Sequence, residues 1–210
     1  LSIALVLAGV ALIANMALSL FIVPGILTFL LLGLAQALAW FYSAPPLQLH
    51  SRGLGEVTST LVVALLTPIT GYYLQTGSLT WLPLLAALPI CCFQFAMLLS
   101  VNFPDAEGDR QVNKQTLVVR YGGQKAARLY SGVVILAFLM LPLLSLAGLP
   151  LLAIGSILLV SPVALMQLWR ISRGDWDNPK RWNHLAFYTI VLLMSASIAE
   201  LGAFMLLLGL

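Results

Sequence analysis

The sequence predicts an all-α, polytopic membrane helix bundle that forms a single domain over residues 1–210. Three observations predict this fold class. The chain is 61% hydrophobic and 8% charged, whereas a soluble domain carries about 25% charged residues. The apolar residues gather in seven runs, each near or above the roughly 20 residues that a helix needs to cross a bilayer. The basic residues all fall in or beside alternate connectors between these runs.

Each apolar run is expected to be a transmembrane helix, because lipid offers no partner for a free backbone N–H or C=O group. Three prolines, at positions 83, 89 and 162, lie inside runs and predict kinks or helix breaks. The predicted segments, in chain order, are Leu1–Val23, Gly25–Tyr42, Val57–Leu74, Leu79–Val101, Ala126–Leu146, Pro150–Trp169 and Leu185–Leu210.

The connectors between these segments differ in length and charge. The first, third and fifth are short and uncharged. The second, residues 43–56, and the fourth, residues 102–125, are longer than simple hairpin loops between helices, which take about 2–8 residues. Pro45 and Pro46 are expected to end the second helix, and Gly53 and Gly55 permit tight turns after it. The sixth connector, residues 172–184, is interpreted as a solvated loop.

The basic residues predict the orientation of the bundle. Seven crossings place the second, fourth and sixth connectors on the same side, which the positive-inside rule assigns to the cytoplasm. We therefore expect an integral protein of a bacterial inner membrane whose charged loops are cytoplasmic. These loops account for the sequence pI of about 9.1 without a nucleic-acid partner, because no basic surface is interleaved with aromatic residues. The bases are Arg52, Arg110, Lys114, Arg120, Lys125, Arg128, Arg170, Arg173, Lys180 and Arg181.

A polar motif follows the fourth apolar run. Asn102, Asp105 and Asp109 have the spacing N-x-x-D-x-x-x-D, which places the three side chains on one face if the helix continues or a new one begins at Pro104. Two carboxylates and an amide oxygen form a site that suits Mg²⁺ together with substrate phosphates. A phosphate-bearing lipid held through the metal is one interpretation of this motif. A solvated loop of mixed charge is the other.

Two stretches resemble the intramembrane aromatic prenyltransferases of the UbiA-type superfamily. They are "YSAPPLQLHSRGLGE", which begins at Tyr42, and "NFPDAEGDRQVNKQTLVVRYG", which begins at Asn102. The second is similar to the second Asp-rich motif of the family, and its tail most resembles the branch that prenylates 1,4-dihydroxy-2-naphthoate in menaquinone biosynthesis. The resemblance implies nine helices and a first Asp-rich motif. Because seven runs and no such motif occur here, we expect two helices and that motif upstream of Leu1, and an inactive fragment without them.

The resemblance implies transfer of a polyprenyl group from its diphosphate to an aromatic acceptor, with Mg²⁺ as the cofactor and the lipid bilayer as the surroundings. Asn102, Asp105 and Asp109 would be the metal ligands, with the two aspartates acting in catalysis. The ring of Tyr42 would stabilise the allylic cation. The residues expected to bind the diphosphate or to line the prenyl cavity are Lys114, Arg110, Arg52, His50, Arg120 and Gln94.

Two other functions are compatible with the sequence. A transporter or channel could line an ion path with acidic residues, although it would be expected to place them near the middle of the bilayer. Glu200 is the one acid inside an apolar run, and a buried, hydrogen-bonded role competes there with a functional one. A catalytically inactive member of the same superfamily is the other alternative. Among the polar residues inside runs, Asn15, Gln36 and Gln167 are expected to hold helices together.

Overall fold

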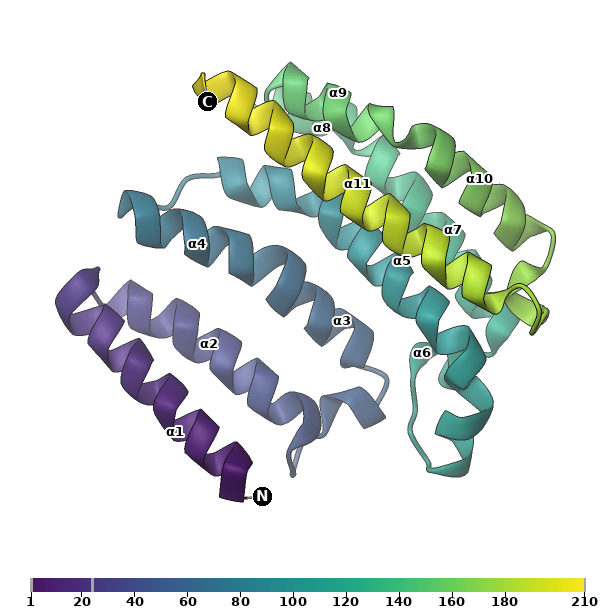
Figure 1. Cartoon of the computed structure of the whole chain (residues 1–210), viewed down its shortest axis with the longest axis horizontal. Helices are drawn as coiled ribbons and strands as arrows, with labels where there is room; N and C mark the ends of the chain where they lie inside the picture. Colours follow the sequence, from purple (N-terminus) through teal and green to yellow (C-terminus); the bar gives the residue numbers. More distant parts are fainter. Residues whose placement is uncertain (1, 24, 210) are drawn as a thin grey trace.

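The computed structural model describes residues 2–23 and 25–209, and within these residues the chain forms helices and no strand. Six helices are long and apolar enough to cross a membrane, and a seventh span consists of two helices that meet at 44°. These spans coincide with the seven apolar runs, so the predicted all-α membrane bundle is confirmed. Figure 1 shows the long helices packed side by side.

The first three spans form one side of the bundle (Figure 1). The first consists of α1 and a π-helical turn, and the second is α2. The third consists of α3, a second π-helical turn and α4, and it begins two residues before the predicted Val57. The bounds are α1 Ser2–Ala17, first π-turn Leu18–Ile22, α2 Ile26–Ser43, α3 Gly55–Thr60, second π-turn Leu61–Leu66 and α4 Thr67–Thr76.

The remaining spans form the other side around the 30-residue helix α5. A short helix, α6, links α5 to α7, and a 3₁₀ turn links α10 to α11. The bounds are α5 Leu82–Gln111, α6 Leu117–Tyr121, α7 Gly123–Leu139, α8 Leu141–Leu146, α9 Leu151–Leu159, α10 Ser161–Ser172, 3₁₀ turn Asp175–Asp177 and α11 Trp182–Leu208.

The prolines act according to their position in each helix. Pro162 lies in the first turn of α10, directly after the 44° break that follows α9, and this confirms the break predicted there. The prediction for Pro83 is wrong, because α5 begins at Leu82 and the proline occupies its first turn, where the missing N–H has no helical partner to lose. Pro89 lies inside an uninterrupted α5. Pro142 marks a break between α7 and α8 that the sequence did not predict.

The hydrophobic core lies where α5 packs against α7 and α11. Phe93 of α5, Tyr130 of α7 and Leu192 of α11 are completely buried. Large apolar side chains instead face outward on the surfaces that a bilayer would cover, such as Leu159 on α9 and Leu201 on α11. An apolar exterior around a packed interior is the pattern expected of a helix bundle in lipid, so the chain is an integral membrane protein.

Polar side chains inside the spans join neighbouring helices, as predicted. Gln36 of α2 donates a 2.8 Å hydrogen bond to the carbonyl of Ala11 in α1. Gln167 of α10 donates to the Leu185 carbonyl at 2.8 Å and to the Thr189 hydroxyl at 2.6 Å, both in α11. These bonds satisfy buried groups that lipid could not.

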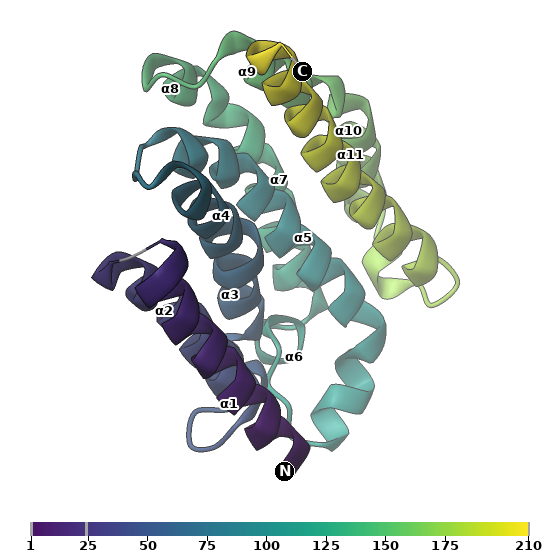
Figure 2. The same cartoon turned by 60° about the vertical axis from the view of Figure 1, so that its left-hand side comes forward.

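The charged connectors lie at one end of the bundle. Figures 1 and 2 show the start of α1, the α2–α3 connector, α6 and the α10–α11 connector at this end, and the C-terminal end of α11 at the other. We call it the charged end. Its location agrees with the alternation of the basic connectors along the sequence, and its cytoplasmic orientation stays a prediction.

Candidate functional site

Three segments meet at the charged end of α5. They are the α2–α3 connector with the start of α3, the last turns of α5 and the segment that contains α6. Residues 102–125 are not a single loop: α5 continues to Gln111, which confirms the option that the helix runs on through the motif, and α6 follows. Ala106, Glu107 and Arg110 favour a helix, and Glu107 pairs with Arg110 across one turn at 2.9 Å. The N-x-x-D-x-x-x-D motif therefore lies on a continuous helix.

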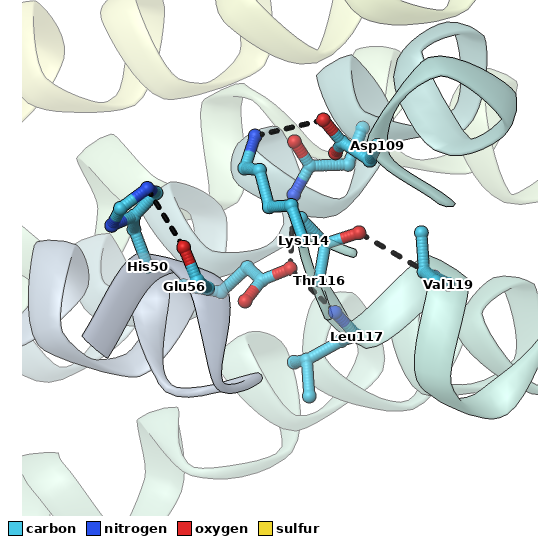
Figure 3. A network of polar contacts seen from close by, with 9 residues as sticks. His50, Glu56, Asp109, Lys114, Thr116, Leu117 and Val119 are labelled. Carbon is cyan, nitrogen blue, oxygen red and sulfur yellow. Dashed lines mark hydrogen bonds and ion pairs between the residues drawn. The ribbon is translucent and has the colours of Figure 1, made fainter. Parts of the chain in front are cut away.

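Glu56 joins all three segments. It lies in the first turn of α3, and only 3% of its surface is exposed. Its Oε1 accepts hydrogen bonds from the side-chain amide of Asn102 and from the backbone N–H of Leu117, both at 2.9 Å. Figure 3 shows this carboxylate between its own helix and the start of α6. Glu56 therefore fixes the positions of the two sequence stretches relative to each other.

Glu56 is not among the site residues predicted from the sequence. A signal was present, because Glu56 is the only acidic residue before Asp105 and falls where a polar connector meets an apolar run. A carboxylate at such a boundary gains from the N-terminal end of the helix that follows it.

The carboxylate of Glu56 also determines how Asn102 is oriented. An ionised carboxylate only accepts hydrogen bonds, so Asn102 must turn its NH₂ group toward Glu56. The amide oxygen of Asn102 then points away from Glu56 and keeps its lone pairs for another partner. This is the atom that the sequence analysis expects to bind a metal.

The two aspartates of the motif have different surroundings. Asp105 is exposed, whereas only 8% of the Asp109 surface is exposed. The Oδ1 of Asp109 forms an ion pair with the Lys114 ammonium at 3.1 Å, seen at the top of Figure 3. The Oδ2 of Asp109 is buried and has no hydrogen-bond partner among the described residues. Asp109 thus offers one free oxygen next to a lysine.

The second connector packs directly on the segment before α6. The backbone N–H of Gln115 donates to the Ser51 carbonyl at 3.0 Å. Gly53 has a φ of +74°, and a Cβ there would lie 3.1 Å from the Gln115 carbonyl oxygen and 3.4 Å from the Arg120 side chain. Because residue 53 lacks a side chain, the two backbones approach this closely without displacing their neighbours. Thr116 then caps α6 by accepting the Val119 N–H at 3.4 Å.

Tyr42 and His50 lie against each other at the end of α2. Their ring centroids are 5.5 Å apart, and His50 Nδ1 lies 2.7 Å from the Tyr42 carbonyl oxygen. Because a carbonyl only accepts, Nδ1 must carry a proton, and in the neutral ring Nε2 accepts from the Ser51 hydroxyl at 2.9 Å. Both ring nitrogens of His50 are therefore engaged, one by the end of α2 and one by Ser51 of the connector.

Several predicted site residues make contacts outside this cluster. Arg52 donates to the carbonyl of Pro46 at 2.8 Å within its own connector. Arg110 is engaged on the exposed face of α5 by Glu107. Gln94 is buried in α5, about 12 Å along the helix from Asn102 at 1.5 Å per residue. The structure thus brings Asp109 and Lys114 together near Glu56, which holds Asn102 (Figure 3). It places the Arg120 side chain beside Gly53 and leaves Asp105 exposed. Arg52 and Arg110 have local partners.

The donor set at this site is compatible with Mg²⁺. Among the described residues, no group of three or more Asp, Glu, His or Cys side chains could hold a metal by itself. Mg²⁺ does not need such a group, since it is commonly bound by one or two carboxylates together with substrate phosphates. The unpartnered Oδ2 of Asp109 and the free amide oxygen of Asn102 are oxygen donors of the required kind.

Comparison with known proteins gives matches to prenyltransferases and a phytyltransferase. The model of the UbiA prenyltransferase family matches residues 1–208. A 1,4-dihydroxy-2-naphthoate octaprenyltransferase from Bacillus subtilis (strain 168) is 26% identical over 110 residues, which are 52% of this chain and 35% of the relative. Its counterpart from Mycobacterium leprae (strain TN) is 27% identical over 97 residues, 46% of this chain and 33% of the relative.

A third relative is a 2-carboxy-1,4-naphthoquinone phytyltransferase from Synechocystis sp. (strain ATCC 27184 / PCC 6803 / Kazusa). It is 29% identical over 92 residues, 44% of this chain and 30% of the relative. The matched segments thus span about a third of the length of these curated relatives. No solved structure gives a significant match.

Proposed function

The chain belongs to the UbiA prenyltransferase family, and we propose that it transfers a polyprenyl group from a prenyl diphosphate to 1,4-dihydroxy-2-naphthoate in menaquinone biosynthesis. The observation that carries this proposal is that Glu56, at the start of α3, joins α3 to the N-x-x-D-x-x-x-D helix and to α6 at the charged end. The named activities of the three naphthoate or naphthoquinone relatives support the choice of acceptor.

In this proposal the chain's own residues bind and orient the diphosphate. Lys114 and Arg120 would attract its oxygens at the end of α5, where Glu56 holds the amide of Asn102 in place. Asn102, Asp105 and Asp109 would hold Mg²⁺. The ion, when bound, would neutralise the negative charge of the leaving group. The ion pair between Lys114 and Asp109 keeps the lysine at the site before substrate arrives.

The apolar helices would hold the prenyl chain and exclude water from the carbon that ionises. Tyr42 lies in the last turn of α2, next to the second connector, and its ring would stabilise a developing cation. Arg52 would hold the shape of that connector through its bond to Pro46, and His50 would tie the connector to the end of α2. Gln94 would line the cavity deeper in α5.

The acceptor is tested directly in membranes that contain the complete protein. They would be supplied with a polyprenyl diphosphate, Mg²⁺ and either 1,4-dihydroxy-2-naphthoate or 4-hydroxybenzoate, and prenylated products would be measured by mass spectrometry. We expect a prenylated naphthalene product, lost on chelation of the metal. Product from the benzoate alone would reject the proposed acceptor, and no product from either would reject aromatic prenyl transfer in favour of an inactive family member.

A further inference from the structure

A pocket lies at the charged end, between the end of α10, the 3₁₀ turn at Asp175–Asp177 and the start of α11. Its volume is about 300 Å³. No residue that lines it belongs to the candidate prenyl-transfer site. The lining residues are Trp169, Arg170, Arg173, Asp175, Arg181 and His184.

The pocket carries excess positive charge. Three guanidinium groups and an imidazole face a single carboxylate, that of Asp175. Asp175 is buried, and its Oδ1 is already paired with Arg181 at 2.6 Å. Neither Arg170 nor Arg173 has a carboxylate within 4.0 Å among the residues that the structure describes. Two arginines are therefore left for an anion from outside the chain.

Aromatic rings hold these two arginines in place. The guanidinium of Arg170 lies over the Tyr188 ring at 4.7 Å from its centroid, and that of Arg173 lies over the Trp169 ring at 4.4 Å. Stacking occupies the face of a guanidinium and leaves the N–H groups at its edge free to donate. Two planar groups fixed in this way are suited to bind phosphate oxygens in pairs.

The surroundings of the pocket indicate where the phosphate comes from. Trp169 is 56% exposed and lies near the end of a span, where tryptophan is enriched at the membrane–water interface. Leu165, one turn earlier on α10, is 65% exposed, and Phe187, one turn into α11, is 59% exposed. Both are apolar surfaces that acyl chains could contact below a headgroup. Free phosphate would make no use of them.

We propose that this pocket binds the phosphate headgroup of an anionic phospholipid of the surrounding bilayer, through Arg170 and Arg173. Basic pockets between transmembrane helices are suited to such headgroups. The proposal is independent of the prenyl-transfer function, because no residue of the two sites is shared.

The test uses the complete protein purified in a neutral detergent and compares lipid retention by native mass spectrometry. Phosphatidylglycerol and phosphatidylcholine would be added in parallel to wild type, to Arg170→Gln/Arg173→Gln and to Lys125→Gln/Arg128→Gln. The last variant is the matched control, because it removes two bases from α7, near the charged end, outside both sites. Gel filtration and thermal unfolding would verify that each variant is folded.

We expect wild type and the control to retain phosphatidylglycerol in preference to phosphatidylcholine. We expect the double arginine variant to bind phosphatidylglycerol at least about tenfold more weakly, since each arginine would donate charge-assisted hydrogen bonds. Equal retention by that variant, or an equal loss in the control, would overturn the assignment. Displacement of the lipid by millimolar inorganic phosphate would show a site for free phosphate and would overturn the lipid source.

Discussion

At the residue scale, a single buried carboxylate organises the candidate site. Glu56 accepts hydrogen bonds from α5 and from the first residue of α6, and it has no partner for Oε2 among the described residues. The sequence motif predicted which residues of α5 belong to the site, but it did not predict that Glu56 orients Asn102. The spacing of Asn102, Asp105 and Asp109 was enough to predict a shared helical face, whereas the contact with Glu56 depends on packing between distant segments.

Removing this carboxylate should loosen the site. Glu56→Leu would leave the buried Leu117 N–H and the Asn102 amide without an acceptor, and we expect it to destabilise the protein by about 2 kcal/mol or more. Glu56→Gln keeps an acceptor oxygen, so its loss of unfolding free energy should be less than half that of Glu56→Leu. The midpoint of unfolding in detergent measures both variants. Equal loss in the two would show that the charge, and not the hydrogen bonds, is what matters.

Gly53 should be intolerant of even a methyl group. Its φ of +74° costs an L-residue about 1–2 kcal/mol, and Gly53→Ala would also press on the Gln115 carbonyl oxygen at 3.1 Å. Gly77→Ala is the matched control, because Gly77 has a φ of +70° but open space around its Cβ position. We expect a larger fall in unfolding midpoint and in prenyl transfer for Gly53→Ala. Similar effects would mean that the close contact between the connectors is unimportant.

At the scale of elements, apolar run length predicted the spans well, but the charged ends of the helices were harder to place. The fourth apolar run ends at Val101, where polar residues begin, and the sequence left open whether the helix continues beyond it; α5 continues to Gln111. Hydropathy indicates which part of a helix can lie in lipid. The helix itself can extend into water beyond that part when its residues favour helix and pack on a neighbouring segment. The five-residue α6 was not predicted, because isolated helices this short are unstable without tertiary contacts.

The contact between α7 and the 3₁₀ turn depends on another glycine. A Cβ at Gly123, the first residue of α7, would lie 2.5 Å from the Trp176 ring. We expect Gly123→Ala to destabilise the protein by about 1–3 kcal/mol through overpacking. Gly132→Ala, in the same helix with open space around it, should be neutral or stabilising. Recovery of stability in Gly123→Ala/Trp176→Leu would identify the ring as the cause.

At the scale of the whole molecule, the alternation of charged and uncharged connectors fixes a common end for all three basic regions. The sequence predicted this arrangement before any packing was known, because connector order alone assigns sides in a bundle of seven spans. What it could not predict is which loops touch. The α2–α3 connector contacts the segment before α6 through Ser51 and Gln115. These two residues are far apart in the sequence, and only the packing of the helices brings them together.

The orientation of the bundle can be measured by labelling in intact cells. In a Cys91→Ser/Cys92→Ser background, Ser78→Cys places a thiol in the uncharged α4–α5 connector, and Asn178→Cys places one in the charged α10–α11 connector. A membrane-impermeant maleimide should label only the first from outside, and both after the membrane is opened. Labelling of Asn178→Cys in sealed cells would contradict the cytoplasmic position of the charged end.

The central claim is that the motif at the end of α5 performs prenyl transfer, and carboxylate substitutions within one helical segment test it most directly. Asp105→Asn, Asp109→Asn and Glu107→Gln each remove one negative charge. Glu107 is the control, because it lies outside the N-x-x-D-x-x-x-D motif and, among the described residues, its one ion pair is with Arg110 on the exposed face of α5.

The measurement is the rate of prenyl transfer by the complete protein in membranes, with expression matched. We expect each aspartate variant to lose about 100-fold or more, as is usual when a group that stabilises transition-state charge is removed, while Glu107→Gln stays within about twofold of wild type because surface ion pairs contribute little. Prenyl transfer at close to the wild-type rate in both single variants, Asp105→Asn and Asp109→Asn, would contradict the assignment of this motif as the prenyl-transfer site.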